Sequence, residues 1–71
     1  MLERGQTVLI VGNALGAPEA TLNRPGIIID IEEEDGNLIY EVETERTPFS
    51  HVDKWTGYNR WFYISDDIQA K

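Results

Sequence analysis

The stretch of residues 26–46 constrains the fold of this chain most strongly. It reads GIIIDIEEEDGNLIYEVETER, with apolar and acidic residues alternating on either side of Asp35-Gly36. Alternation with a period of two is typical of a strand that buries one face. Asp-Gly is a preferred pair for the tight turn of a hairpin. The stretch therefore predicts a β-hairpin with one apolar face and one acidic face.

The same pattern predicts the register of the hairpin. A turn with an even number of residues gives three inward-facing pairs, Ile31 with Tyr40, Ile29 with Val42 and Ile27 with Thr44. An odd turn would break this face, because a slip of one residue moves every side chain to the other side of the strand. The even turn also sets Asp30 opposite Glu41, and a like-charge pair weakens a sheet.

Further strands are predicted on both sides of the hairpin. Residues 6–11 form the first strand, with Val8 and Ile10 on one face, and residues 12–25 form a long loop rich in Gly and Pro. Long loops in small domains are uncommon and often functional. Residues 47–59 form a second connection, in which Pro48 ends the preceding strand.

The end of the chain is expected to close the sheet. Residues 60–64 read RWFYI and predict a fourth strand, with Phe62 and Ile64 inward and Trp61 and Tyr63 outward. Residues 65–68 resemble a short 3₁₀ turn that tucks Ile68 under the sheet. Residues 69–71 either add a brief closing strand or fray.

The size of the chain limits it to one small domain, residues 1–71. A chain of this length buries a modest core, and the absence of Cys removes disulfides and thiolate metal sites. Residues 1–5 lack the features of a signal peptide, and the longest apolar run, residues 8–11, is too short to span a membrane. We therefore expect a soluble, cytoplasmic protein.

The order of strands, loops and turns resembles that of the SH3-like small barrel. The resemblance covers almost the whole chain, and it depends on three stretches: Arg4-Gly5 before the first strand, Gly26 at the second, and WFYI running into SDDI at residues 61–68. The PsaE-type barrel of photosystem I, the KOW-type barrel and small SH3-like proteins encoded by bacteriophages share this layout. The resemblance implies an all-β, five-stranded barrel with a long first loop and a 3₁₀ turn before the last strand.

The net charge helps to decide which of the functions of such barrels this chain could perform. KOW-type and PsaE-type members are generally basic, whereas this chain has a net charge of −7. Nucleic acids and anionic membranes attract basic proteins, so both partners are disfavoured. The charge favours a protein partner with a basic or mixed-charge surface, or it serves solubility.

Catalysis is not expected. Ser50, His51 and Asp53 are the three residue types of a hydrolase triad, but neighbours on an extended chain point apart. His51 and Asp53 are too few ligands for a closed metal site. The acidic run from Asp30 to Asp35 does not follow the spacing of a calcium-binding loop. We predict no enzyme activity and no cofactor.

Two surfaces are candidates for binding. More than half of the thirteen acidic residues lie in the hairpin, and the predicted outer face carries Asp30, Glu32, Glu41 and Glu43. This face either keeps a small protein soluble and monomeric or docks onto a basic surface. The second surface is an aromatic cluster formed by Trp55, Tyr58, Arg60, Trp61 and Tyr63. Trp, Tyr and Arg are enriched at binding hot spots, although Trp55 and Trp61 are equally suited to capping a tiny core.

The sequence thus predicts a non-catalytic protein-binding module. Its aromatic cluster would anchor the partner, and its acidic face would steer association. A small regulator or inhibitor, with a phage origin, fits this prediction. Two alternatives stay open: an accessory subunit of an enzyme or electron-transfer complex, as the PsaE-type resemblance implies, and a nucleic-acid-binding barrel that stacks bases on its aromatic residues.

Overall fold

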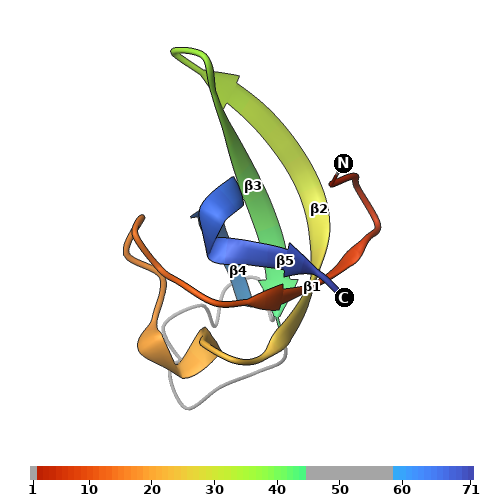
Figure 1. Ribbon diagram of the computed structural model, residues 1–71, viewed down its shortest axis with the longest axis vertical. Coiled ribbons are helices and arrows are strands. Elements are labelled where there is room, and N and C mark those ends of the chain that lie inside the picture. The colour runs from red at the N-terminus through yellow and green to blue at the C-terminus, as the bar shows by residue number, and fades with distance from the viewer. Residues whose placement is uncertain (1, 45–58) are drawn as a thin grey trace.

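The strands follow one another in the predicted order (Figure 1). The computed structural model describes residues 2–44 and 59–71, for Asn59 the backbone alone. Its elements are β1 (Thr7–Ile10), the 3₁₀ turn η1 (Glu19–Thr21), β2 (Pro25–Glu34), β3 (Asn37–Thr44), β4 (Asn59–Ile64), the 3₁₀ turn η3 (Ser65–Asp67) and β5 (Ile68–Ala70). The all-β fold class is confirmed, as is the 3₁₀ turn before the last strand. No helix in the described ranges has the length and apolarity to cross a bilayer.

All five strands belong to one antiparallel sheet. Their order across it is β4-β3-β2-β1-β5, so the last strand returns to the far side of the first. The long strands β2 and β3 curve together, and β1 and β5 lie at one end of them (Figure 1). Within the described residues the sheet is open, because β4 and β5 are its two edges.

The turn of the β2–β3 hairpin is the predicted one. Glu34 pairs with Asn37, which leaves Asp35 and Gly36 as a turn of two residues. Both have positive φ angles, 51° and 81°, as a type I′ turn requires. The turn also fixes the neighbouring register, so the predicted pairs Ile31–Tyr40 and Asp30–Glu41 are both confirmed.

The register of residues 26–28, on the far side of Asp30 from the turn, differs from the prediction. Ile28, and not Ile29, pairs with Val42, and Gly26, and not Ile27, pairs with Thr44. The shift occurs between Ile28 and Asp30, where Ile29 is the extra residue of a β-bulge. A bulge bends its strand and increases the local twist, which suits the strongly curved β2.

The bulge decides which isoleucines enter the core. Ile28 is completely buried, whereas Ile27 is 46% exposed, so the prediction that Ile27 faces inward is wrong. Beyond the bulge the alternation resumes, and Ile31 packs against the core as expected. One inserted residue therefore moves an apolar side chain from the inner to the outer face.

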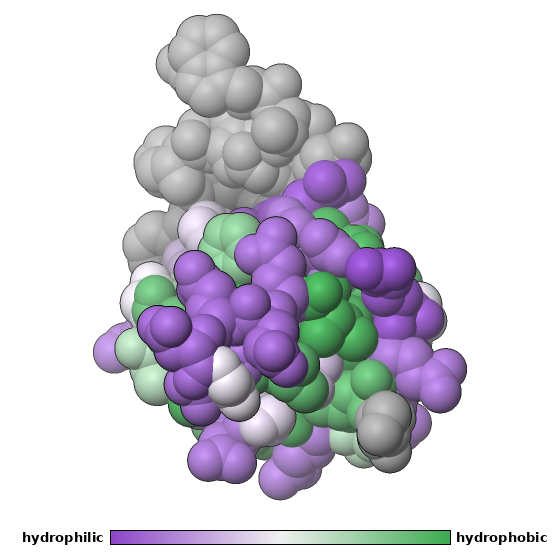
Figure 2. All heavy atoms as spheres, turned by 90° about the horizontal axis from the view of Figure 1, so that it is seen from above, coloured by the Kyte–Doolittle hydropathy of each residue, from purple (hydrophilic) through white to green (hydrophobic). Residues whose placement is uncertain are grey.

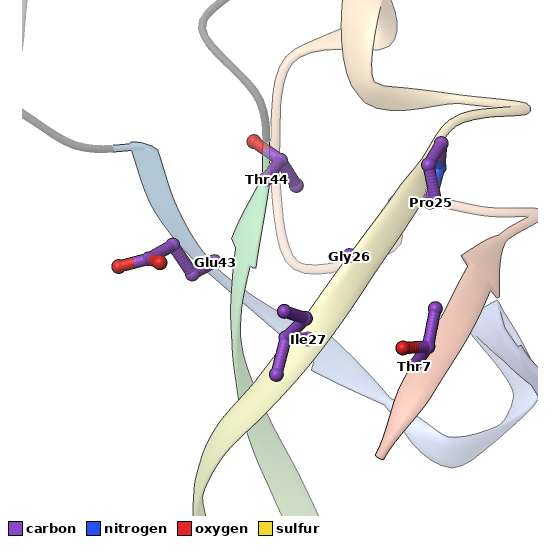
Figure 3. Close-up of a pocket in the computed structure, with 6 residues that line it drawn as sticks. All are labelled: Thr7, Pro25, Gly26, Ile27, Glu43 and Thr44. Atoms are coloured by element: carbon purple, nitrogen blue, oxygen red, sulfur yellow. The ribbon is translucent and has the colours of Figure 1, made fainter. Parts of the chain in front are cut away.

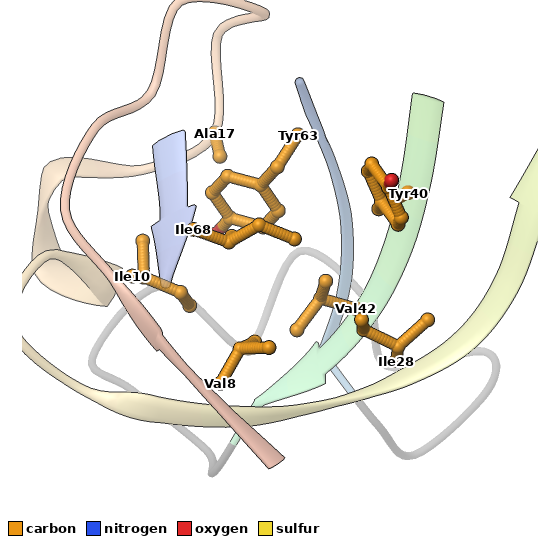
Figure 4. Close-up of a cluster of buried hydrophobic side chains, with 8 residues drawn as sticks. All are labelled: Val8, Ile10, Ala17, Ile28, Tyr40, Val42, Tyr63 and Ile68. Carbon is orange, nitrogen blue, oxygen red and sulfur yellow. The ribbon is translucent and has the colours of Figure 1, made fainter. Parts of the chain in front are cut away.

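The core lies on the concave side of the sheet and draws on every strand (Figure 4). Val8 and Ile10 of β1 are both buried, as predicted, and Ile68 closes the cluster from β5. Within the described part of the chain, the buried hydrophobic residues are Val8, Ile10, Ala17, Ile28, Tyr40, Val42, Tyr63 and Ile68.

The buried and exposed sides of strand β4 are exchanged relative to the prediction. Tyr63 is completely buried and Trp61 packs partly against the core, while Phe62 is 49% exposed. The reason is the pairing with β3: Tyr63 lies beside Tyr40, and Trp61 beside Val42, both of which point inward. Residues directly opposite each other share a face, so β3 imposes its orientation on β4.

The long loop before β2 is packed on the core. Ala17 and Thr21 are buried, and Leu22 is partly buried against the core cluster. Thr21 Oγ1 donates a hydrogen bond of 2.7 Å to the carbonyl of Pro18 and accepts one of 2.8 Å from the hydroxyl of Tyr63. The loop is therefore joined to β4 by buried polar contacts.

Candidate functional site

The predicted aromatic cluster does not form one exposed surface among the described residues. Trp55 and Tyr58 lie outside the described residues, as do Ser50, His51 and Asp53. Tyr63 is buried, and its side chain offers no surface to a partner. Trp61 is half-buried, and its Nε1 has no hydrogen-bond partner among the described residues. Arg60 alone of the described members is exposed.

The acidic face is present, and its composition is more mixed than predicted. We call the side of β2–β3–β4 that points away from the core the outer face. Cross-strand pairing arranges it in three rows: Ile27–Glu43–Arg60, Asp30–Glu41–Phe62 and Glu32–Ile39–Ile64. The four predicted acids, Asp30, Glu32, Glu41 and Glu43, all lie on this face. Apolar residues and one arginine lie between them.

Two of these carboxylates form ion pairs with arginine side chains of the same chain. Asp30 Oδ1 accepts hydrogen bonds from Arg4 Nε, at 3.2 Å, and from Arg4 Nη2, at 2.9 Å. Glu43 Oε2 lies 3.5 Å from Arg60 Nε. Both pairs are at the surface, where an ion pair contributes little to stability. Their effect is to reduce the charge that these two acids present to a partner.

Glu41 is different. It lies between Asp30 on β2 and Phe62 on β4, and no Lys or Arg in the described ranges forms an ion pair with it. Arg4 relieves the like-charge contact by pairing with Asp30, and among the described residues no cation pairs with the Glu41 carboxylate. Opposite Glu41 on the neighbouring strand is Phe62, whose side chain is half-exposed. A carboxylate next to an aromatic ring can bind a cationic side chain through both charge and cation–π attraction.

Further acids extend beyond these rows to the hairpin turn. Glu32, Glu33, Glu34 and Asp35 are all exposed. Figure 2, which views the molecule from the end that carries the turn, shows hydrophilic residues gathered in front with apolar residues exposed between them. The electrostatic field at this end is therefore negative. The acidic residues continue from the turn along β2 into the outer face.

Three outer-face residues were missed from the sequence, Phe62, Ile64 and Ile27. Residues 60–64 are apolar on both faces, so alternation alone cannot tell which side is buried. Ile27 is exposed because of the bulge, which leaves no clear signal in a run of three isoleucines. Arg4 was noted only as part of an entry turn. Arg4 and Asp30 are 26 residues apart in the chain, so no local sequence pattern could indicate that they are in contact.

The buried Tyr63 is the one described group whose titration is clearly shifted. Burial raises the pKa of its hydroxyl above the ordinary value of 10.0. The negative charge of Asp67 adds to the increase in pKa. Tyr63 is therefore a neutral hydroxyl that joins the loop to β4.

No three His, Asp or Glu side chains within residues 2–44 and 59–71 are grouped so as to hold a metal ion. What the outer face offers is recognition chemistry: carboxylates, one guanidinium and exposed apolar groups. Comparison with known proteins adds no assignment, since the chain matches no family model, no curated protein and no solved structure.

Proposed function

We propose that this chain is a non-catalytic protein-binding module of the SH3-like barrel type, which docks a basic or mixed-charge partner on its outer face. The barrel assignment is supported by the strand order, the long connection between β1 and β2, and the 3₁₀ turn between β4 and β5. Such a module acts as a small regulator or inhibitor, for which a phage is a fitting source.

The observation that carries the proposal is the row Asp30–Glu41–Phe62. Phe62 is a large aromatic residue left 49% exposed on the edge strand β4, opposite Glu41. Aromatic residues surrounded by polar groups are common anchors of protein interfaces. The neighbouring carboxylates favour a basic partner and accelerate its association.

The proposed anchor therefore differs from the aromatic cluster expected from the sequence. Phe62 takes the place of the buried Tyr63, and Arg60 lies at the border of the site, where it pairs with Glu43. Asp30, Glu41 and Glu43 keep the steering role that the sequence suggested, and Glu32 extends it toward the hairpin turn.

The test is affinity capture from cells that encode the chain, with a matched pair of double variants. Glu41→Gln with Phe62→Thr removes the proposed site. Glu33→Gln with Leu38→Thr removes a second exposed acid and apolar residue that also pair across β2 and β3, outside the three rows. Leu38 is 44% exposed, close to Phe62, so the two variants lose similar surface.

We expect the first double variant to lose the proteins that the wild type recovers, and the second to retain them. With a recovered partner in hand, Phe62→Thr is expected to weaken binding about tenfold. Glu41→Gln should slow association at low salt more than at high salt. Equal recovery by both double variants, each folded by circular dichroism, would refute the outer face as the binding site.

A further inference from the structure

A pocket of about 280 Å³ opens beside the row Ile27–Glu43–Arg60 of the outer face. It lies across β1, β2 and the end of β3 (Figure 3). Its lining residues are Thr7, Pro25, Gly26, Ile27, Glu43 and Thr44. Most of this lining is apolar.

The β-bulge in β2 contributes to this pocket. The bulge at Ile29 turns Ile27 outward, where it forms one wall opposite Thr7. Gly26 lines the pocket with its backbone alone, since a Cβ atom there would point to the core side, 2.5 Å from the Cγ1 of the buried Val42.

Arg60 helps to keep the pocket apolar. Figure 3 shows the Glu43 carboxylate directed away from Ile27, so that the stem of Glu43 lines the pocket and its charge does not. The ion pair with Arg60 Nε holds the carboxylate on the β4 side. The chemistry inside the pocket thus suits an uncharged, apolar side chain.

The pocket lies at a defined distance from Glu41 and Phe62. Ile27 is opposite Glu43, and Glu41 is two residues along the same strand. Side chains two residues apart on a strand are about 6.6 Å from each other. An extended segment that runs along β3 presents its own side chains at the same spacing, so residues i and i+2 of such a segment can reach both places.

We propose that this pocket holds an apolar side chain of the partner, located two residues from the Lys or Arg that binds at Glu41 and Phe62. The inference rests on the proposed function and deepens it, because it defines the ligand as an extended segment with a basic and an apolar residue at positions i and i+2. Charge complementarity selects this occupant. A second copy of the chain would bring another net charge of −7 to the same acidic face.

Short blocked peptides test the spacing without knowledge of the partner. One peptide has the order Gly-Arg-Gly-Leu-Gly, and its isomer has the order Gly-Arg-Leu-Gly-Gly, with identical composition and charge. A third, Gly-Arg-Gly-Gly-Gly, lacks the apolar residue. Binding of each to the full chain is followed by NMR, through the amide signals of Ile27, Thr7 and Phe62 and the methyl signals of Ile27 and Thr7.

We expect the first peptide to shift the signals of Ile27 and Thr7 and to bind about tenfold more tightly than either of the others. Ile27→Thr, which keeps a β-branched residue at an exposed position, should abolish that preference. Leu38→Thr, a similarly exposed position outside the pocket, should leave it unchanged.

Equal affinities for the three peptides, with no change at Ile27, would overturn the pocket assignment while leaving the proposed function intact if the Phe62 signals respond to arginine. Absence of binding by every peptide would overturn it as well. The capture experiment would then be the remaining test of the outer face as a binding site. It is independent of the pocket, because it uses no peptide and no pocket variant.

Discussion

The hydroxyl of Tyr63 on β4 donates a hydrogen bond of 2.8 Å to Thr21 Oγ1, 42 residues earlier in the chain. Thr21 in turn donates to the carbonyl of Pro18, so the buried hydroxyls form a short relay. Both residues are completely buried. This relay fixes the long β1–β2 loop on the core, and it also keeps Tyr63 inward and leaves Phe62 on the outer face.

Removing one hydroxyl tests the relay. Tyr63→Phe is expected to lower the free energy of unfolding by about 1 kcal/mol, because a buried hydrogen bond is lost while Thr21 keeps its bond to Pro18. Urea denaturation measures the change. Tyr40→Phe is the control, since Tyr40 is also buried and its hydroxyl makes no hydrogen bond to a described residue. Equal losses in the two variants would contradict a specific role for the relay.

Alkaline pH tests the same group through its titration. Burial raises the pKa of Tyr63, so the unfolded chain releases this proton near its ordinary pKa of 10.0 and the folded chain releases it only at higher pH. The folded state then binds more protons than the unfolded state. The contribution to stability is complete below pH 10 and is lost as the pH rises through the folded pKa.

We therefore expect the free energy of unfolding to fall more steeply above pH 10 in the wild type than in Tyr63→Phe. Urea denaturation at a series of alkaline pH values provides the comparison, and an ultraviolet absorbance titration follows the phenolate directly. Parallel pH profiles for the two proteins would show that Tyr63 titrates alike in the folded and unfolded states.

Several features of the fold followed from the sequence because they depend on local chemistry. Asp35-Gly36 specified the turn and hence the nearby pairs, and the alternation of Val8 and Ile10 identified the buried face of β1. The features that could not be predicted depend on distant partners. Which side of β4 is buried depends on its pairing with Tyr40 and Val42 of β3.

The candidate site was predicted only in its acids for the same reason. Alternation places carboxylates on one face whatever lies beside them, so Asp30 and Glu41 could be paired from the sequence. Whether a carboxylate is neutralised depends on cations far along the chain, such as Arg4. The exposed apolar anchors depend on a bulge and on a neighbouring strand, and neither has a local signature.

Asp67 connects η3 to the start of the long loop and provides a third test. Its backbone carbonyl accepts hydrogen bonds from the amides of Val11 and Gly12, and its carboxylate accepts one of 2.9 Å from the amide of Ala14. Asp67→Ala should lower the free energy of unfolding by about 1 kcal/mol, since one charge-assisted bond at a half-buried site is lost.

Asp67→Asn should retain most of that stability, because an amide oxygen can still accept from Ala14. The control is Asp66→Ala, since Asp66 is exposed and its side chain makes no hydrogen bond to a described residue. Thermal denaturation compares the three variants. A loss in Asp66→Ala as large as in Asp67→Ala would point to the charge of the turn and not to the Ala14 contact.

The β2–β3 turn provides a test of backbone conformation alone. Gly36 has φ of 81°, and a Cβ atom added there would meet nothing within 4 Å. Gly36→Ala should therefore cost about 1 to 2 kcal/mol through the left-handed backbone and not through a clash. Gly36→Asn should cost less, because Asn tolerates this region. Equal costs for Ala and Asn, measured by urea denaturation, would contradict this explanation.

Gly26 tests close packing between β2 and β3. A Cβ atom at this position would lie 2.5 Å from Val42 Cγ1 and 3.1 Å from the carbonyl oxygen of Glu43. Gly26→Ala should therefore destabilise the protein by about 1 to 3 kcal/mol, the usual cost of overpacking. Because the nearest atom belongs to a side chain, Val42→Ala should relieve much of that cost.

A double-mutant cycle between the two positions separates this clash from other effects of the added methyl group. The double variant Gly26→Ala with Val42→Ala should be more stable than the sum of the single changes predicts, by about 1 kcal/mol or more. Urea denaturation of the four proteins gives the coupling energy. Strict additivity would show that the carbonyl of Glu43 is the group that excludes a side chain, since the backbone contact remains when Val42 is shortened.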